Sequence, residues 1–292
     1  MADLSGTIAR VGHEQPHAPL PEFDDPPIIE VALTAAFDPL LGYTSAHAGL
    51  FWSRVANRFV KAQEQPPLGI PTASERPDVD GAPGAPIVMM ANGLPASRVW
   101  LLSDDDTELV QIQPTSFIRN WRQTPQHQNP YPRYEKLRFE FERDFKEFTA
   151  FAETAGLGTP APTHCEVTYV NHIVAGDAWT KLSEIHKVVK GTSELDRLEF
   201  LPTPEDRRCA ANFAIRDSNG QFLGRLTVSV DPALRRTDMQ PLLILTLTAR
   251  GKPLGGDVSG VLTFFDVAHE WIVRGFADVT TTDVQRRWGR TR

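Results

Sequence analysis

Basic and amide side chains surround a tryptophan in the segment FIRNWR, and these residue types suit the binding of planar or anionic groups. Arg119, Asn120 and Arg122 flank Trp121, and Arg133 follows a short proline-containing link. Guanidinium groups bind carboxylates and phosphates through paired hydrogen bonds, and aromatic rings stack on bases. We therefore predict a binding site formed by these four polar residues. The structural alternative is that Trp121 packs in the core while both arginines of the segment form ion pairs with helix acids.

An extended backbone would separate the two arginines of this segment. Side chains alternate between the faces of a strand, so Arg119 and Arg122 would point in opposite directions. A shared anion site would require a bulge or a turn near Pro125. We expect the two arginines to contribute more to binding than to folding, and Trp121 to be structural.

Two further polar pairs follow the two-residue repeat of a β-strand. Gln111 and Gln113 are separated by one apolar residue, and so are Tyr169 and Asn171 in the second half of the chain. Side chains two residues apart on a strand share a face, so each pair lies on one face of its sheet. If both pairs lie on a concave face, they line one groove. The structural alternative is a solvent-exposed face.

Motifs for catalysis or metal binding are absent from the sequence. It contains neither a glycine-rich phosphate loop nor a G-x-S-x-G nucleophile motif. Its two cysteines, Cys165 and Cys209, are far apart, which excludes a multi-cysteine zinc site. His269 and Glu270 do not form H-E-x-x-H, because Val273 occupies the last position, so we expect His269 to be a core histidine. We therefore expect no catalytic residue, no metal and no cofactor, and the sequence leans away from an enzyme.

Composition indicates a globular protein of mildly acidic character. Hydrophobic residues make up 41% and charged residues 23% of the 292 residues, and the formal net charge is -7. Such a protein repels phosphate backbones unless its basic residues gather, as the arginines at 286–292 do. The N-terminus lacks the apolar region of a signal peptide, and no apolar run is long enough to span a membrane. We expect a cytoplasmic protein that makes no membrane contact.

Hydrophobic periodicity predicts the same order of elements in both halves of the chain. In the first half we expect a strand over 28–37, a helix over 46–62, strands over 98–103 and 108–113, and a long helix over 133–154. In the second half we expect a strand over 164–174, a helix over 178–189, strands over 211–216, 221–230 and 242–250, and a long helix over 261–279. The repeated order indicates an internal duplication.

These elements predict an α+β fold of two similar halves. Each half would place one short and one long helix on one face of an antiparallel sheet, by analogy with TATA-binding-protein-like or helix-grip folds. The expected organisation is a disordered N-terminal tail over 1–25, halves over 26–157 and 158–282, and a basic C-terminal tail over 283–292.

Several longer motifs carry a resemblance to a known family. They are PPIIEVAL, the H-x-G-x-x-W of His47, Gly49 and Trp52, VQIQPTSFIRNWR, YPRYE, CEVTYVNHI and the ending HEWIVRGFADVTT with WGR. The chain resembles a sporadically distributed family of uncharacterised bacterial proteins. The resemblance covers most of the chain from Pro26 onward. It implies a cytoplasmic bacterial protein whose fold spans the whole chain, and it transfers no site residue.

Three functions remain open from the sequence. The first is a non-enzymatic binding protein that engages a protein partner, for example in a bacterial defence or toxin-neutralising pair. The second is a nucleic-acid binder that uses a duplicated sheet saddle and the arginines near the C-terminus. The third is a small-molecule binder or an enzyme with a pocket between a long helix and the sheet.

Overall fold

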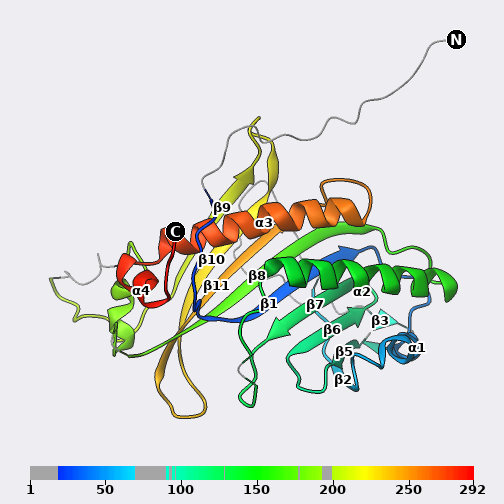
Figure 1. Ribbon diagram of the computed structural model, residues 1–292, viewed down its shortest axis with the longest axis horizontal. Coiled ribbons are helices and arrows are strands. Elements are labelled where there is room, and N and C mark those ends of the chain that lie inside the picture. The colour runs from blue at the N-terminus through cyan, green and yellow to red at the C-terminus, as the bar shows by residue number, and fades with distance from the viewer. Residues whose placement is uncertain are drawn as a thin grey trace, which may run out of the picture.

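The computed structural model describes residues 19–69, 90–91, 94–95, 97–127, 129–176, 178–192 and 199–292. Nine strands form one antiparallel sheet in the order β2-β5-β6-β7-β1-β8-β11-β10-β9 (Figure 1). The strands are β1 Ile28–Phe37, β2 Lys61–Gln65, β5 Arg98–Leu102, β6 Glu108–Gln113, β7 Ser116–Arg122, β8 Pro162–Val174, β9 Cys209–Arg216, β10 Phe222–Leu234 and β11 Pro241–Gly251. A separate hairpin pairs β3 Met90–Ala91 with β4 Leu94–Pro95.

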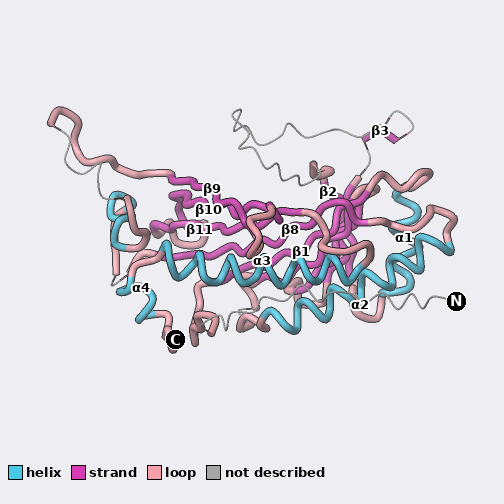
Figure 2. The backbone as a smooth tube through the Cα atoms, turned by 90° about the horizontal axis from the view of Figure 1, so that it is seen from above, coloured by secondary structure: helices cyan, strands magenta, loops and turns pink. Residues whose placement is uncertain are grey.

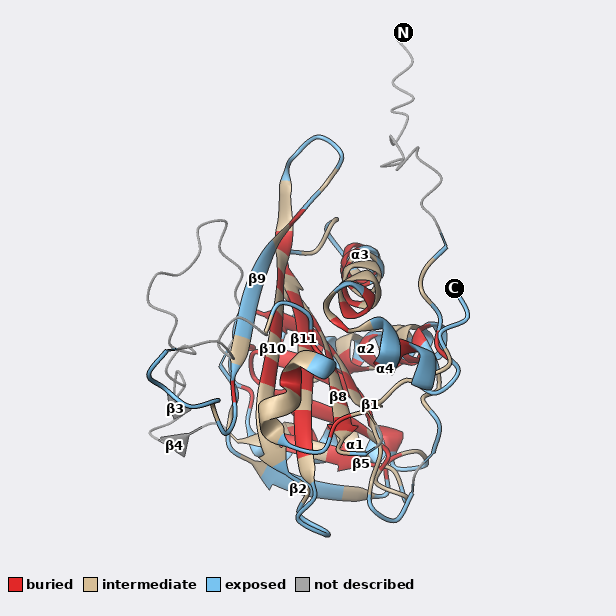
Figure 3. Cartoon of the chain, turned by 90° about the vertical axis from the view of Figure 1, so that its left-hand side faces the viewer, coloured by how far each residue is buried: buried red, intermediate tan, exposed pale blue. Residues whose placement is uncertain are grey.

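The long helices α2 and α3 lie on the same face of this sheet (Figures 2 and 3). The helices are α1 Ser45–Val55, α2 Tyr134–Thr154, α3 Val258–Val279 and α4 Thr282–Arg287, with a 3₁₀ turn, η1, at Leu182–Lys187. Buried residues gather between the sheet and these two helices (Figure 3). We call this side of the sheet the helix face, and the other side the open face. Within the described residues, no helix is long and apolar enough to cross a membrane.

The long helices form because their apolar residues recur at spacings of three and four. In α2 this stripe contains Leu137, Phe141, Phe145, Phe148 and Phe151, and all five are buried. In α3, Asp257 begins the helix by accepting hydrogen bonds from the backbone N–H groups of Ser259 and Gly260. Both helices were expected from the sequence within a few residues of these bounds.

The strand order is mirrored about the centre of the sheet. β1 and β8 pair there in antiparallel fashion, with Val31 opposite Tyr169. From β1 the sheet continues through β7, β6 and β5, and from β8 it continues through β11, β10 and β9. The described part of the chain is therefore a mixed α+β fold built on one continuous antiparallel sheet.

The two short helices differ from the prediction. The helix expected over 46–62 ends at Val55, and Lys61–Gln65 instead pairs with β5 as a strand. Phe59 misled the periodicity argument, because it is buried at the turn between these elements rather than on the helix. The helix expected over 178–189 is only the 3₁₀ turn η1, whose interior includes the non-helical backbone of Glu184.

Both described chain ends pack against the fold. Residues 1–18 lie outside the described residues, but within 19–25, expected to belong to a disordered tail, residues 22–25 pair with the C-terminal segment. The N–H groups of Asp24 and Asp25 donate to the carbonyls of Gly289 and Trp288 at 3.1 Å each. Phe23 anchors the contact, because its buried ring meets Phe276 edge-on with centroids 5.3 Å apart. A single anchoring aromatic in a polar segment leaves no periodic signal, which explains the error.

Candidate functional site

The predicted site residues divide between the two faces of the sheet. Arg119 contacts α2, and Tyr169 contacts α3, so both lie on the helix face together with Asn171. The open face carries Gln111, Gln113, Asn120 and Arg122. The glutamine pair and the Tyr169–Asn171 pair therefore do not meet the condition for lining one groove, which was a shared concave face. The two arginines of the FIRNWR segment do lie on opposite faces, as the extended backbone requires.

On the open face, the predicted amides bond to one another. Trp100 Nε1 donates to Gln111 Oε1 at 2.9 Å, and Gln111 Nε2 donates to Asn120 Oδ1 at 2.7 Å. Asn120 Nδ2 in turn donates to Glu30 Oε1 at 2.7 Å. Burial raises the pKa of Glu30, and this hydrogen bond partly opposes the rise. Because Gln111 and Asn120 are buried, this network stabilises the sheet and offers few groups to a ligand.

The remaining open-face residues are also engaged. Gln113 Nε2 donates to the carbonyl of Leu68, and its Oε1 accepts from the Leu68 N–H, both at 2.9 Å. Arg122 Nε donates to the carbonyl of Asp106 at 3.0 Å. Its guanidinium also lies over the Trp100 ring, 5.2 Å from the centroid.

Arg119 is enclosed by carboxylates in the core. Its side chain is 1% exposed, and Nη2 lies 2.6 Å from Glu108 and 2.9 Å from Glu140. Arg119 Nε is 3.1 Å from Asp144 Oδ2 without hydrogen-bond alignment, so that contact is electrostatic. Trp121 is buried as well. For these two residues the geometry matches the structural alternative, ion pairing with helix acids around a core tryptophan.

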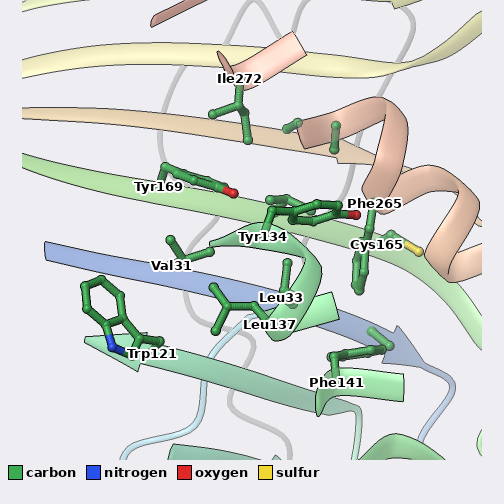
Figure 4. Close-up of a cluster of buried hydrophobic side chains, with 14 of the residues drawn as sticks. Val31, Leu33, Trp121, Tyr134, Leu137, Phe141, Cys165, Tyr169, Phe265 and Ile272 are labelled. Carbon is green, nitrogen blue, oxygen red and sulfur yellow. The ribbon is translucent and has the colours of Figure 1, made fainter. Parts of the chain in front are cut away.

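A cavity of about 400 Å³ opens on the helix face. It lies between α3, the start of α2 and strands β8 and β11, and residues 20–24 together with Thr291 border it. Figure 4 shows Tyr169 on β8, Tyr134 at the start of α2 and Ile272 on α3. Of the predicted site residues, Arg133, Tyr169 and Asn171 line this cavity. Its apolar wall is formed by Leu20, Phe23, Ile28, Leu247, Ile272, Val273 and Phe276.

A chain of polar side chains lies along the wall of this cavity. The hydroxyl oxygens of Tyr131 and Tyr169 are 2.9 Å apart, and the Tyr169 hydroxyl is 3.0 Å from His269 Nδ1. The Tyr134 ring stacks on the imidazole with centroids 4.0 Å apart and planes 7° apart. Tyr134 holds its own orientation by donating to Asp266 Oδ1 at 2.7 Å. These contacts fix the imidazole in one position.

Burial sets the charge of these groups. It lowers the pKa of His269 to about 4, although Glu135, Asp266 and Glu270 act in the opposite direction. It also raises the pKa of Tyr131 and of Tyr169 above the usual range of a phenol. At neutral pH the imidazole and both hydroxyl groups are therefore uncharged.

Asn171 adds a fixed amide to the cavity. The residue is 1% exposed, and Nδ2 donates to the carbonyl of Leu245 at 3.0 Å. This bond orients the amide and leaves Oδ1 and the second N–H of Nδ2 as its other polar groups. Oδ1 accepts no hydrogen bond from any residue that the structure describes.

Charged side chains surround the outer part of the cavity. Arg133 is exposed there, and its Nη1 donates to the carbonyl of Phe23 at 3.2 Å. Three carboxylates, those of Glu22, Asp24 and Glu135, share this border. Glu22 forms an ion pair with Arg292. The border therefore carries more negative than positive charge, and it does not attract anions.

Sequence reasoning missed Tyr131, Tyr134 and His269 as parts of one site. His269 was expected in the core because it lies on the apolar stripe of α3, and it is in fact half-buried beside the cavity. The available signal was a polar residue within that stripe, together with the tyrosines of YPRYE. Within the described residues, no group of three or more metal-ligating side chains could hold a metal ion.

Comparison of the chain with protein-family models, with curated proteins and with solved structures returns no match.

Proposed function

We propose that the protein binds a small, mostly apolar molecule in the cavity between α3 and the sheet. The observation that carries this proposal is a space of about 400 Å³ with apolar walls and a few convergent polar groups. Ligand sites in proteins combine these features, and their volumes begin at about 300 Å³. The polar groups offer hydrogen bonds rather than an ionised acid or base at neutral pH. This favours binding over acid–base chemistry.

The arrangement of the two halves supports a related proposal about how the fold arose. We infer an internal duplication in which β1, β7, β6, β5 and α2 correspond to β8, β11, β10, β9 and α3. The site would then be a helix-grip-like one, formed where one long helix holds a ligand against its sheet. Superposition of residues 28–154 on 164–279 tests the duplication. It fails if these strands do not match in order and direction.

A variant that fills the cavity tests the proposed function. Val273 is half-buried on α3 and lines the cavity, so Val273→Phe places a ring in the space. Val267 on the same helix is also half-buried but does not line the cavity, which makes Val267→Phe the matched control. We expect ligand-observed NMR with a library of small aromatic compounds to detect binders of the native protein. Their affinity should fall at least about tenfold in Val273→Phe and stay unchanged in the control.

Two results would count against the proposal. One is the absence of any binder from the library at millimolar concentration. The other is binders whose affinity is equal in both variants, since they would occupy another surface. Thermal melts of both variants separate loss of binding from loss of folding.

A second candidate function is binding of a protein partner, and the edge strand β9 favours it. Residues 210–213 on this strand are exposed, and Phe213 is 43% exposed beside a groove of about 260 Å³ that Trp271 also lines. An exposed strand edge can accept an additional strand. Affinity capture with the native protein and with Phe213→Lys tests this candidate, which predicts partners that only the native protein retains.

Nucleic-acid binding receives less support. The chain is acidic overall, and the hydrogen-bonding groups of Gln111 and Asn120 are used within the sheet. The bacterial, cytoplasmic setting that the family resemblance implies stays a prediction, and fractionation of the source cells tests it.

A further inference from the structure

We propose that the cavity selects an uncharged, mostly apolar molecule that donates one hydrogen bond, from a hydroxyl or an N–H group, to Asn171 Oδ1. This inference rests on the proposed function and names its ligand class.

The first argument is the state of the Asn171 amide. Donation from Nδ2 to the carbonyl of Leu245 fixes which end of the amide is the acceptor. The residue lines the cavity, and among the described residues nothing donates to Oδ1. A carbonyl oxygen can accept two hydrogen bonds, so Oδ1 can accept one from a ligand. The residue therefore presents an acceptor for a group that enters the cavity.

The second argument is that the neighbouring polar groups already satisfy one another. Tyr131, Tyr169 and His269 form a continuous chain of hydrogen bonds at 2.9 and 3.0 Å. Its proton direction depends on the imidazole tautomer, so the chain does not impose a fixed donor or acceptor on a ligand. The bond to Leu245 fixes the orientation of the Asn171 amide, and its Oδ1 offers an acceptor to a ligand that carries a donor.

The third argument concerns charge. The inner wall is apolar apart from the neutral chain and the Asn171 amide. A charged group there would lose its hydration without gaining an opposite charge. At the border, Glu22 is paired with Arg292, and Arg133 is outnumbered by Asp24 and Glu135, so a carboxylate or phosphate ligand gains no net attraction. An uncharged donor fits both regions.

Indole and benzofuran provide a matched pair of probes. They have the same bicyclic shape and neither is charged, but only indole has an N–H donor. We expect the native full-length chain to bind indole about tenfold more tightly than benzofuran, as measured by ligand-observed NMR. In Asn171→Leu the affinities for indole and benzofuran should become about equal, because benzofuran retains its apolar contacts.

Tyr169→Phe tests the neighbouring chain as the selecting group, because it removes the central hydroxyl but leaves the Asn171 amide and its bond to Leu245 in place. Val267→Phe, which does not line the cavity, is the control and should keep the full indole preference. Tyr169→Phe should lose less of this preference than Asn171→Leu. Loss of the preference in Tyr169→Phe with its retention in Asn171→Leu would assign selection to the hydroxyl chain and overturn the proposal.

The remaining outcomes separate this inference from the proposed function. Equal affinity of the native protein for both probes, lowered by Val273→Phe, overturns the ligand class but keeps the binding cavity. This comparison uses no Asn171 variant, so it tests the ligand class even if Asn171→Leu fails to fold. Absence of binding by either probe at millimolar concentration counts against the proposed function and the inference together.

Discussion

The two long helices cover the same face of one sheet, but the spaces beneath them differ. Under α2, the rings of Phe117, Phe141, Phe145 and Phe148 lie within 5.3 to 5.8 Å of one another in successive contacts and fill the space. Under α3, Ile272, Val273 and Phe276 instead border a cavity of about 400 Å³. The same strand order therefore supports a filled core on one side and an open site on the other.

Polar residues on the helix face show the same contrast. Arg119 on β7 is enclosed by three carboxylates, so its charge is matched within the fold. Asn171 on β8 donates from Nδ2 to the carbonyl of Leu245, and the residue lines the cavity. A buried charge surrounded by opposite charges is compensated within the fold, whereas a polar group beside a cavity is available to a ligand. The contrast is therefore between the spaces beneath α2 and α3, because Ile28, Tyr131 and Tyr134 of the first half also line the cavity.

The largest expected effect comes from removing a ring from the filled core beneath α2. Phe148 is 0% exposed, and its ring meets those of Phe37, Phe51 and Phe117. Phe148→Ala should lower the free energy of unfolding by about 3–5 kcal/mol, because it removes these contacts and leaves a void. Urea denaturation measures the change. Phe139 on the same helix is 65% exposed, so Phe139→Ala is the control, with an expected change within about 0.5 kcal/mol. Equal effects would show that the α2 stripe is not the core of this half.

An intermediate effect tests whether the cavity beneath α3 excludes water from His269. Burial lowers the pKa of His269 to about 4, so the folded protein resists a proton that the unfolded chain accepts below about pH 6.5. The contribution of His269 to stability is then greatest above pH 6.5 and is lost as the pH falls toward 4. Between pH 7 and pH 4 the native protein should lose on the order of 2 kcal/mol more stability than His269→Gln. Parallel pH curves from urea denaturation would mean that water solvates the imidazole.

The sequence predicts the long elements well because their signals are local. The phenylalanine stripe of α2 repeats over the whole helix, and the turn at Ser218–Gly220 separates β9 from β10 as expected. Alternation also assigned each polar pair to a single face of its strand. Local patterns could not assign the pairs to the same or to opposite faces, because that depends on how β1 pairs with β7 and β8. The register of strands distant in sequence is a tertiary property.

The candidate site was harder to predict than the fold for the same reason. Tyr169 and His269 are 100 residues apart in sequence, and only the packing of α3 on β8 brings them to 3.0 Å. Tyr131 comes from a third segment, the link before α2. Each of these residues has an ordinary structural explanation when taken alone. Their joint position beside the cavity is what marks them as a candidate site.

The smallest expected effect comes from a substitution that enlarges a side chain beneath α3, and it is compared with one that enlarges a side chain beneath α2. Ala152 on α2 is 0% exposed in the filled core, so Ala152→Leu forces neighbouring side chains out of preferred rotamers. We expect it to lower the free energy of unfolding by about 1–3 kcal/mol. Val273→Phe on α3 directs its additional atoms into the cavity, where they cover apolar wall instead of displacing it. Its effect should stay within about 1 kcal/mol in either direction. Urea denaturation of both variants at pH 7 measures the difference, and a larger loss in Val273→Phe than in Ala152→Leu would mean that the space beneath α3 is already filled.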